Sequence, residues 1–181
     1  MDYVVLDKSG KGWAVKKGFE KVQDEIIGFV DADNSTTAPE FDKILKKIEI
    51  CDVAIGSRYT PGASVIHRVS WLRKLAGRLF HIIVRVITFL PFYDTQCGAK
   101  VFHKRVIEKI LPELRVNNMA FDIEILFACL KNNFHVEEVP IYWSEGQAST
   151  FITSKRKLIK TSIGMLFSVI VMRIRYLFYT N

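Results

Sequence analysis

Residues 26–38 read I-I-G-F-V-D-A-D-N-S-T-T-A, a short apolar run that ends in two aspartates. The run Ile26–Val30 is rich in β-branched residues and predicts a buried strand. Because side chains alternate along an extended chain, we expect Asp31 and Asp33 to project from one face at the end of that strand. Two such carboxylates can hold a hard divalent cation that shares its other coordination positions with water and substrate phosphates. A solvated turn or a helix cap is the alternative, since D-x-D pairs also occur in loops.

Strand-like and helix-like stretches alternate around this segment. Further short β-branched runs lie at 3–6 and 53–55, and helical patterns lie at 13–21 and 39–48. This alternation predicts an α/β fold with a mostly parallel sheet and helices on its faces. In such sheets, ligands bind beyond the carboxyl ends of the strands. We therefore expect Asp31 and Asp33 to meet the segment Gly56–Arg58 at one edge of the sheet.

Composition favours one globular domain in a reducing compartment. The chain has 181 residues, 49% of them hydrophobic, which is enough for one sizeable core. Its three cysteines, Cys51, Cys97 and Cys129, lie far apart and form no C-x-x-C pair, which argues against a disulfide framework or a zinc site. The first residues lack the basic and apolar regions of a secretory signal.

Positive charge is concentrated in two parts of the chain. The net charge is +7, and no Asp or Glu occurs between Asp52 and Asp94 or after Glu145. Each acid-free stretch contains an apolar helical pattern, at 72–90 and at 158–179. Neither has the roughly 20 predominantly apolar residues of a clean membrane span. We expect both helices to lie in a membrane interface, where basic side chains reach anionic lipid.

Two other interpretations of these basic helices stay open. They could be core helices with solvated basic edges. A nucleic-acid surface is disfavoured, because the polar faces lack interleaved aromatic and basic side chains. The expected organisation is one α/β domain over residues 1–157, which includes the amphipathic helix 72–90, followed by a basic interfacial helix over 158–181. A homo-oligomer is compatible with this organisation.

Two further acidic segments add candidate site residues. Asp94 opens D-T-Q-C-G-A-K-V-F (94–102), directly after the first basic helix. Asp122 and Glu124 lie in M-A-F-D-I-E-I-L (119–126), and residues two apart do not share a helix face. At most one of these two side chains can therefore point into a given pocket. The plainer interpretations are a turn residue for Asp94 and a helix N-cap for Asp122.

Seven motifs in order resemble one family. They are G-K-G-W-A-V (10–15), F-V-D-A-D-N-S-T (29–36), G-S-R-Y (56–59), D-T-Q-C-G-A-K-V-F (94–102), A-F-D-I-E-I-L (120–126), E-V-P-I-Y-W (138–143) and R-I-R-Y-L (173–177). Together they resemble family 2 glycosyltransferases, and more narrowly the polyprenyl-phosphate hexose synthases of the dolichyl-phosphate glucosyltransferase branch. The D-T-Q-C-G segment is more similar to the glucosyl branch than to the mannosyl branch.

The resemblance implies a GT-A type sheet and a set of roles. Asp31 would lie near the ribose and diphosphate, and Asp33, with Asp31, would hold Mg²⁺ or Mn²⁺. The remaining implied contacts to the donor or the acceptor phosphate are Lys11, Arg58, Arg68, Arg73, Gln96 and Ser149. UDP-glucose is the favoured donor, GDP-mannose is the second, and the acceptor is a polyprenyl phosphate.

The resemblance also implies inversion of the sugar in one displacement, with Asp94 at the position of a base. Physical chemistry tempers that role, because a phosphate monoester already carries about −1.5 to −2 charges at pH 7. Asp94 could instead orient the acceptor or order the arginines. Asp122 is the next catalytic candidate, followed by Glu124.

The chain also departs from the family pattern. Relatives begin with a P-x-Y-N-E type motif and a D-D-x-S-x-D type segment, and neither occurs here. Loss of those strands would leave an exposed sheet edge. Relatives often read W-x-E and then G-S-K, whereas residues 143–150 contain no lysine and Ser149 is only a loose match.

Two hypotheses follow from the matches and the departures. The first is a glycosyltransferase attached peripherally or monotopically to the cytosolic face of a membrane. The second is a non-catalytic remnant of such an enzyme, which docks on a membrane or on a partner that supplies the missing strands.

Overall fold

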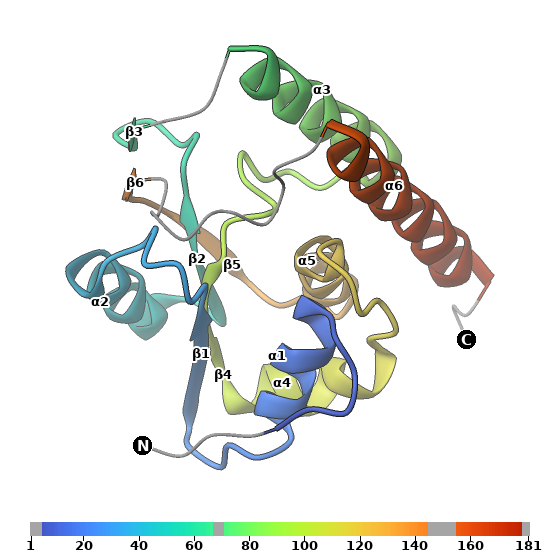
Figure 1. Ribbon diagram of the computed structural model, residues 1–181. Helices are drawn as coiled ribbons and strands as arrows, with labels where there is room; N and C mark the ends of the chain where they lie inside the picture. The colour runs from blue at the N-terminus through green and yellow to red at the C-terminus, as the bar shows by residue number, and fades with distance from the viewer. Residues whose placement is uncertain (1–4, 67–70, 145–154, 179–181) are drawn as a thin grey trace.

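The computed structural model describes residues 5–66, 71–144 and 155–178, with side chains described over 5–66, 77–144 and 159–178. The helices are α1 (Lys11–Phe19), α2 (Ala38–Lys47), α3 (Trp71–Thr88), α4 (Lys104–Ile110), α5 (Phe121–Lys131) and α6 (Lys155–Phe178), with 3₁₀ turns η1 (Ile48–Ile50) and η2 (Leu111–Glu113). The strands are β1 (Ile26–Val30), β2 (Val53–Ser57), β3 (Ser64–Ile66), β4 (Ala99–His103), β5 (Val136–Pro140) and β6 (Tyr142–Ser144). The elements alternate as the sequence predicts, and the α/β class is confirmed (Figure 1).

The main sheet has the strand order β1-β4-β2-β5. Strand β4 is antiparallel to both β1 and β2, whereas β2 and β5 are parallel. Strands β1, β2 and β5 therefore run in one direction and β4 runs against them. The expected mostly parallel sheet is corrected to a mixed sheet, because hydrophobic patterning reports burial of a strand and not its direction. A separate pair, β3 and β6, is parallel.

The predicted elements agree with the observed ones except at the N-terminus. Strand β1 has the predicted bounds, and α2, α3 and α6 lie within three residues of theirs. The strand expected at 3–6 is not found over residues 5 and 6, and residues 3 and 4 lie outside the described part. Strand β1 is consequently an edge strand of the described sheet.

Helices cover both faces of the main sheet. Helix α2 packs on one face, and α1, α4 and α5 pack on the other (Figure 1). Strand β2 is buried throughout and serves both layers, since Val53 and Ile55 join the α4–α5 core while Ala54 packs with Ile44 of α2. This period-2 division fixes the register of the central strand.

The three cysteines are free, buried thiols. Burial raises the pKa of Cys97 to about 11, so this thiol stays protonated at neutral pH. Cys97 therefore behaves as a small apolar side chain in the core formed by α2 and the sheet.

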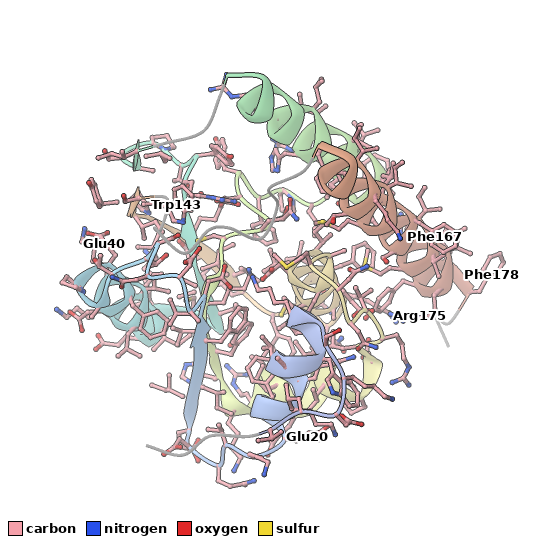
Figure 2. The ribbon with its side chains drawn as sticks, in the orientation of Figure 1. Glu20, Glu40, Trp143, Phe167, Arg175 and Phe178 are labelled. Carbon is pink, nitrogen blue, oxygen red and sulfur yellow. The ribbon has the colours of Figure 1, made fainter. Side chains whose placement is uncertain are left out.

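Helices α3 and α6 lie side by side beyond the sheet (Figure 1). Their outer surfaces expose large apolar side chains: Leu79, Ile82, Ile83 and Val86 of α3, and Ile163, Phe167, Val171, Ile174 and Phe178 of α6. Figure 2 marks Phe167 and Phe178 along α6. Many exposed apolar side chains on two neighbouring helices indicate an interaction site rather than a solvated face.

Helix α6 differs from the prediction in one respect. By length and composition alone, Ile159–Phe178 could cross a membrane, although the sequence shows no clean span by pattern. One side of the same helix packs on the protein through Val169 and Met172, and Arg175 Nη2 forms an ion pair of 2.5 Å with buried Glu124. The helix therefore has both a docked face and an exposed apolar face.

Candidate active site

The two aspartates of the opening segment lie in a turn just after β1. The Asp31 amide donates to the Gly98 carbonyl at 2.8 Å, and the Ser35 amide donates to Asp33 Oδ1 at 3.0 Å. Asn34, which lies between Asp33 and Ser35, has a φ of 57°, and asparagine tolerates this backbone conformation better than most residues do. The aspartates thus follow the strand in a turn rather than continuing it, so the alternation used to place them on one face does not apply.

Gly98 makes room for the Asp31 carboxylate. A Cβ at position 98 would lie 1.8 Å from Asp31 Oδ2, so only glycine permits this approach. The other oxygen, Oδ1, lies 3.0 Å from Lys11 Nζ. About 39% of the Asp31 side chain remains exposed, so the carboxylate stays accessible from solvent.

A buried ion cluster extends from Asp31 into the core. Lys11 Nζ also donates to Asp122 Oδ2 at 2.6 Å, and Lys100 Nζ donates to Asp122 Oδ1 at 2.7 Å and to the Cys97 carbonyl. The Lys100 side chain is fully buried and that of Asp122 is 2% exposed. Four elements, β4, α5, α1 and the turn after β1, therefore meet through charges of alternating sign.

Both Asp122 oxygens are occupied by ammonium groups. Burial alone would raise the pKa of Asp122, but Lys100 and Lys11 outweigh it and hold the pKa below its usual value of 3.8. Burial likewise lowers the pKa of Lys11, and the charges of Asp122 and Asp31 raise it by more. An ionised carboxylate with two cationic partners supports a positioning role for Asp122 rather than that of a base.

Glu124 has a different, structural set of partners. Its carboxylate accepts from the backbone amides of Arg115 and Val116 and from Arg175. Asp122 and Glu124 thus point to different surroundings, as their spacing on a helix predicts. Neither is the N-cap of α5, which is Ala120.

The second cluster is a two-pronged pair between Arg58 and Asp94. Arg58 Nε donates to Asp94 Oδ2 at 2.6 Å and Arg58 Nη2 donates to Oδ1 at 2.9 Å. The backbone amides of Arg58 and Gln96 each add a donor to this carboxylate at 3.1 Å. Burial would raise the pKa of Asp94, but Arg58 outweighs it and the pKa is lowered. Asp94 is thus a buried, ionised carboxylate, and both of its oxygens accept hydrogen bonds.

Neighbouring groups fix this pair in place. Glu138 accepts from the amides of Tyr93 and Asp94 at 2.8 and 2.9 Å, which holds the loop that carries Asp94. The Arg58 guanidinium lies over the rings of Tyr59 and Trp143, with its carbon 5.5 and 5.4 Å from their centroids. Such a guanidinium has little freedom to turn away.

The two clusters meet at the predicted edge of the sheet. Strands β1 and β2 run in the same direction, so Asp31 and Arg58 both follow carboxyl ends, as expected. The segment 94–100 joins them, because Asp94 binds Arg58, Gly98 packs on Asp31 and Lys100 binds Asp122.

Some predicted residues are not placed, and others were not predicted. Arg68 and Ser149 lie outside the described residues, as does the side chain of Arg73 in α3. Gln96 is half-buried beside Asp94. Lys100 and Glu138 were not predicted from the sequence as site residues. A lysine within the apolar strand A-K-V-F was the available signal for Lys100, since lysine is almost never fully buried without a partner.

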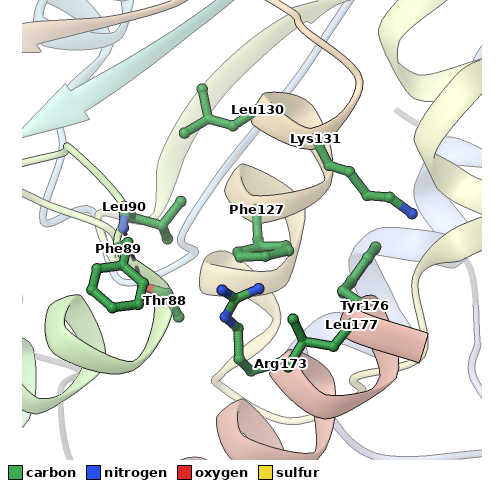
Figure 3. Close-up of a pocket in the computed structure, with 9 residues that line it drawn as sticks. All are labelled: Thr88, Phe89, Leu90, Phe127, Leu130, Lys131, Arg173, Tyr176 and Leu177. Carbon is green, nitrogen blue, oxygen red and sulfur yellow. Dashed lines mark hydrogen bonds between the residues drawn. The ribbon is translucent and has the colours of Figure 1, made fainter. Parts of the chain in front are cut away.

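A cavity of about 400 Å³ lies elsewhere, between the C-terminal ends of α3, α5 and α6 (Figure 3). The Arg173 guanidinium lies beneath the Phe127 ring (Figure 3). Its carbon is 5.4 Å from the ring centroid. None of its lining residues belongs to the two charged clusters. Over the described residues, no three or more His, Cys, Asp or Glu side chains form a group that could hold a metal.

The chain is similar to proteins of known activity. It is 34% identical to a dolichyl-phosphate beta-glucosyltransferase of Dictyostelium discoideum over 93% of its own length and 52% of that protein, and 32% identical to the one of Saccharomyces cerevisiae, with 93% and 53% covered. The chain thus spans about half the length of these curated relatives.

A solved structure shares the fold. It is glucosyl-3-phosphoglycerate synthase from Mycobacterium tuberculosis in complex with Mn²⁺, UDP-glucose and phosphoglyceric acid, with a TM-score of 0.61 and 12% identity over 93% of this chain and 56% of that one. At this identity the likeness concerns the fold alone. The family model described as Glycosyl transferase family 2 matches residues 2–111, more than half of the sequence. The GT-A-like sheet, the ordered motifs and this match agree that the chain belongs to glycosyl transferase family 2.

Proposed function

We propose that this protein transfers a hexose, with glucose favoured, from a nucleoside diphosphate sugar to a polyprenyl phosphate at a membrane surface. The observation that carries the proposal is the accessible acidic turn after β1, where Asp31 lies 3.0 Å from Lys11, at the same edge of the sheet as Arg58, which follows β2 and is fixed by Asp94. The dolichyl-phosphate beta-glucosyltransferases among the relatives support this choice of acceptor and sugar. UDP-glucose is the first donor to test and GDP-mannose the second.

The acidic turn has the residues that a divalent cation needs. Asp33 and Asp31 would hold Mg²⁺ or Mn²⁺, and Gly98 provides the space in which the Asp31 carboxylate sits. Two carboxylates suffice, because Mg²⁺ is commonly bound by one or two carboxylates together with water and substrate phosphates. When bound, the cation would offset charge on the leaving diphosphate. The solved structure of similar fold was obtained with Mn²⁺ and UDP-glucose, which supports a divalent cation as the cofactor.

Arg58 and Lys11 would stabilise the diphosphate from the protein side. Both are held by buried carboxylates, so their positive charges are oriented before the substrate binds. Preorganised charges of this kind stabilise a transition state without reorganisation during the reaction. Of the roles considered for Asp94, its four hydrogen bonds favour ordering of Arg58 over proton abstraction. A phosphate acceptor, which is already anionic, does not require a base.

The exposed apolar faces of α3 and α6 would place the site at a bilayer. A polyprenyl phosphate keeps its tail in lipid, while its headgroup must meet a water-soluble nucleotide sugar. Exposed Leu79, Ile82 and Phe167 can enter the headgroup boundary, and exposed Arg78 and Arg85 of α3 can reach anionic lipid. We propose that this attachment is on the cytosolic face.

The test is transfer of radiolabelled glucose from UDP-glucose to a polyprenyl phosphate in membranes that contain the protein. We expect product with Mg²⁺ or Mn²⁺, no product with EDTA, and none from Asp33→Ala. The matched control is Asp42→Ala, which removes an exposed aspartate whose partner is Lys46 of the same helix. A folded, membrane-bound protein that makes no product and binds no UDP with either metal would contradict the proposal. GDP-mannose in parallel identifies the donor.

The second candidate function is a non-catalytic module that docks on a membrane or on a partner that supplies strands. The position of β1 at the edge of the described sheet favours it, since an edge strand offers unpaired backbone groups. Turnover by the isolated 181-residue chain would exclude this candidate. Absence of turnover that is restored by a strand-supplying partner would support it.

A further inference from the structure

The Asp31 carboxylate already has a cationic neighbour before any metal binds. Lys11 Nζ lies 3.0 Å from Asp31 Oδ1, and Asp31 is one of the two proposed metal ligands. We propose that Lys11 is an internal counter-ion for the acidic turn, which keeps divalent-cation affinity low until a nucleoside diphosphate binds. This inference rests on the proposed function, since it assumes that the turn binds a metal with a diphosphate.

Lys11 cannot simply move away when a metal approaches. Its ammonium is closer to Asp122, at 2.6 Å, than to Asp31, and Asp122 is held in turn by fully buried Lys100. The backbone is fixed as well, because the amide of Gly12 donates to the Asn117 carbonyl at 3.0 Å. A Cβ on Gly12 would lie 2.6 Å from the Val116 carbonyl oxygen, so the start of α1 is packed directly on this loop.

The charges of the cluster explain the expected coupling. Asp122 and Lys100 offset one another, which leaves Lys11 to offset one of the two carboxylates in the turn. The turn alone therefore presents a net charge near −1 to an incoming divalent cation, with a fixed ammonium beside it. A diphosphate adds negative charge that both the metal and Lys11 can contact. Metal and nucleotide should then each strengthen the binding of the other by the same factor, as linkage requires.

The experiment measures Mn²⁺ binding by electron paramagnetic resonance on the purified full chain, with and without UDP. Wild type should bind Mn²⁺ weakly alone and more tightly with UDP. Lys11→Met should bind Mn²⁺ alone about tenfold more tightly, because a unit charge a few ångströms away is removed. The same variant should lose most of the gain that UDP gives to wild type. The two effects have opposite sign, which general damage to the fold would not produce.

Controls separate charge from structure. Lys17→Met removes a half-buried lysine of the same helix that pairs with Glu20, and its Mn²⁺ affinity should match that of wild type both with and without UDP. Lys11→Arg keeps the cation and should leave Mn²⁺ affinity without UDP at the wild-type level. If Lys11→Met does not fold, Lys11→Gln replaces it, since glutamine is neutral and can still donate to Asp122.

The failure of this inference differs from the failure of the proposed function. Mn²⁺ affinity without UDP that stays unchanged or falls in both neutral variants overturns the counter-ion role, whatever the enzymatic activity. Wild-type protein that binds Mn²⁺ but never UDP contradicts the proposed function, and in that case tighter Mn²⁺ binding by Lys11→Met still supports the counter-ion role.

Discussion

Asp94 and Asp31 lie at the same edge of the sheet, yet their carboxylates are used in different ways. Asp94 is buried and receives two guanidinium and two amide donors. Asp31 is about 39% exposed and has one lysine partner at one of its oxygens. A saturated carboxylate fixes its neighbours, whereas a partly satisfied one can still bind a ligand. The number of donors that each carboxylate accepts from therefore separates positioning residues from binding residues within a single acidic site.

Asp122 gives the strongest test of the saturated class. Asp122→Ala leaves Lys11 and Lys100 without their shared anion, and loss of one partner from a buried charge cluster costs about 3–5 kcal/mol of unfolding free energy. Urea denaturation followed by circular dichroism measures this loss. Asp42→Ala, at an exposed ion pair with Lys46, should cost less than about 0.5 kcal/mol. Equal costs for the two variants would contradict the division.

Asp94 should affect both stability and activity. Asp94→Asn removes the charge that opposes Arg58, and we expect a loss of about 1–3 kcal/mol in unfolding free energy. Transfer should fall on the order of 10²-fold through misplacement of Arg58, with the apparent KM for the donor rising. Denaturation and steady-state kinetics measure the two effects. A base role predicts instead a large fall in kcat with unchanged stability and donor KM.

Asp33 tests the partly satisfied class. Its carboxylate accepts one amide hydrogen bond, from Ser35, so Asp33→Ala should cost no more than about 1 kcal/mol in unfolding free energy. Metal-dependent transfer should nevertheless be lost. The measurement pairs a denaturation curve with the radiolabel assay on the same preparation. A destabilisation as large as that of Asp122→Ala would place Asp33 with the structural carboxylates.

The contribution of Asp94 and Asp122 to the free energy of unfolding should vary little with pH near neutrality. Because the pKa of both Asp94 and Asp122 lies below the usual 3.8, these groups bind fewer protons when folded than when unfolded at acidic pH. Their contribution is complete above about pH 5 and declines as the pH falls through 4 and below. The stability difference between wild type and Asp94→Asn should therefore be constant from pH 5 to 7 and shrink below pH 4. A difference that grows on acidification would contradict the lowered pKa.

The sequence predicted local elements better than it predicted partnerships. Ile26–Val30 and the helices α1, α2, α3 and α6 were found because apolar periodicity is a local property. The direction of β4 could not be predicted, since a buried strand has the same pattern in either direction. The pairing of Arg58 with Asp94 spans 36 residues and depends on that topology. Asp122 was identified as a candidate, but its role depends on Lys100, and the burial of Lys100 follows from the tertiary structure.

Strand β4 carries a consequence of its own. Because it runs against β1 and β2, its starting end, rather than its finish at His103, lies level with the ends of those strands. The loop that leads into it, with Asp94 and Gly98, is thereby delivered between Asp31 and Arg58. A single reversed strand thus places this loop between the turn after β1 and the end of β2. If β4 ran in the opposite direction, the loop would lie at the other end of the sheet.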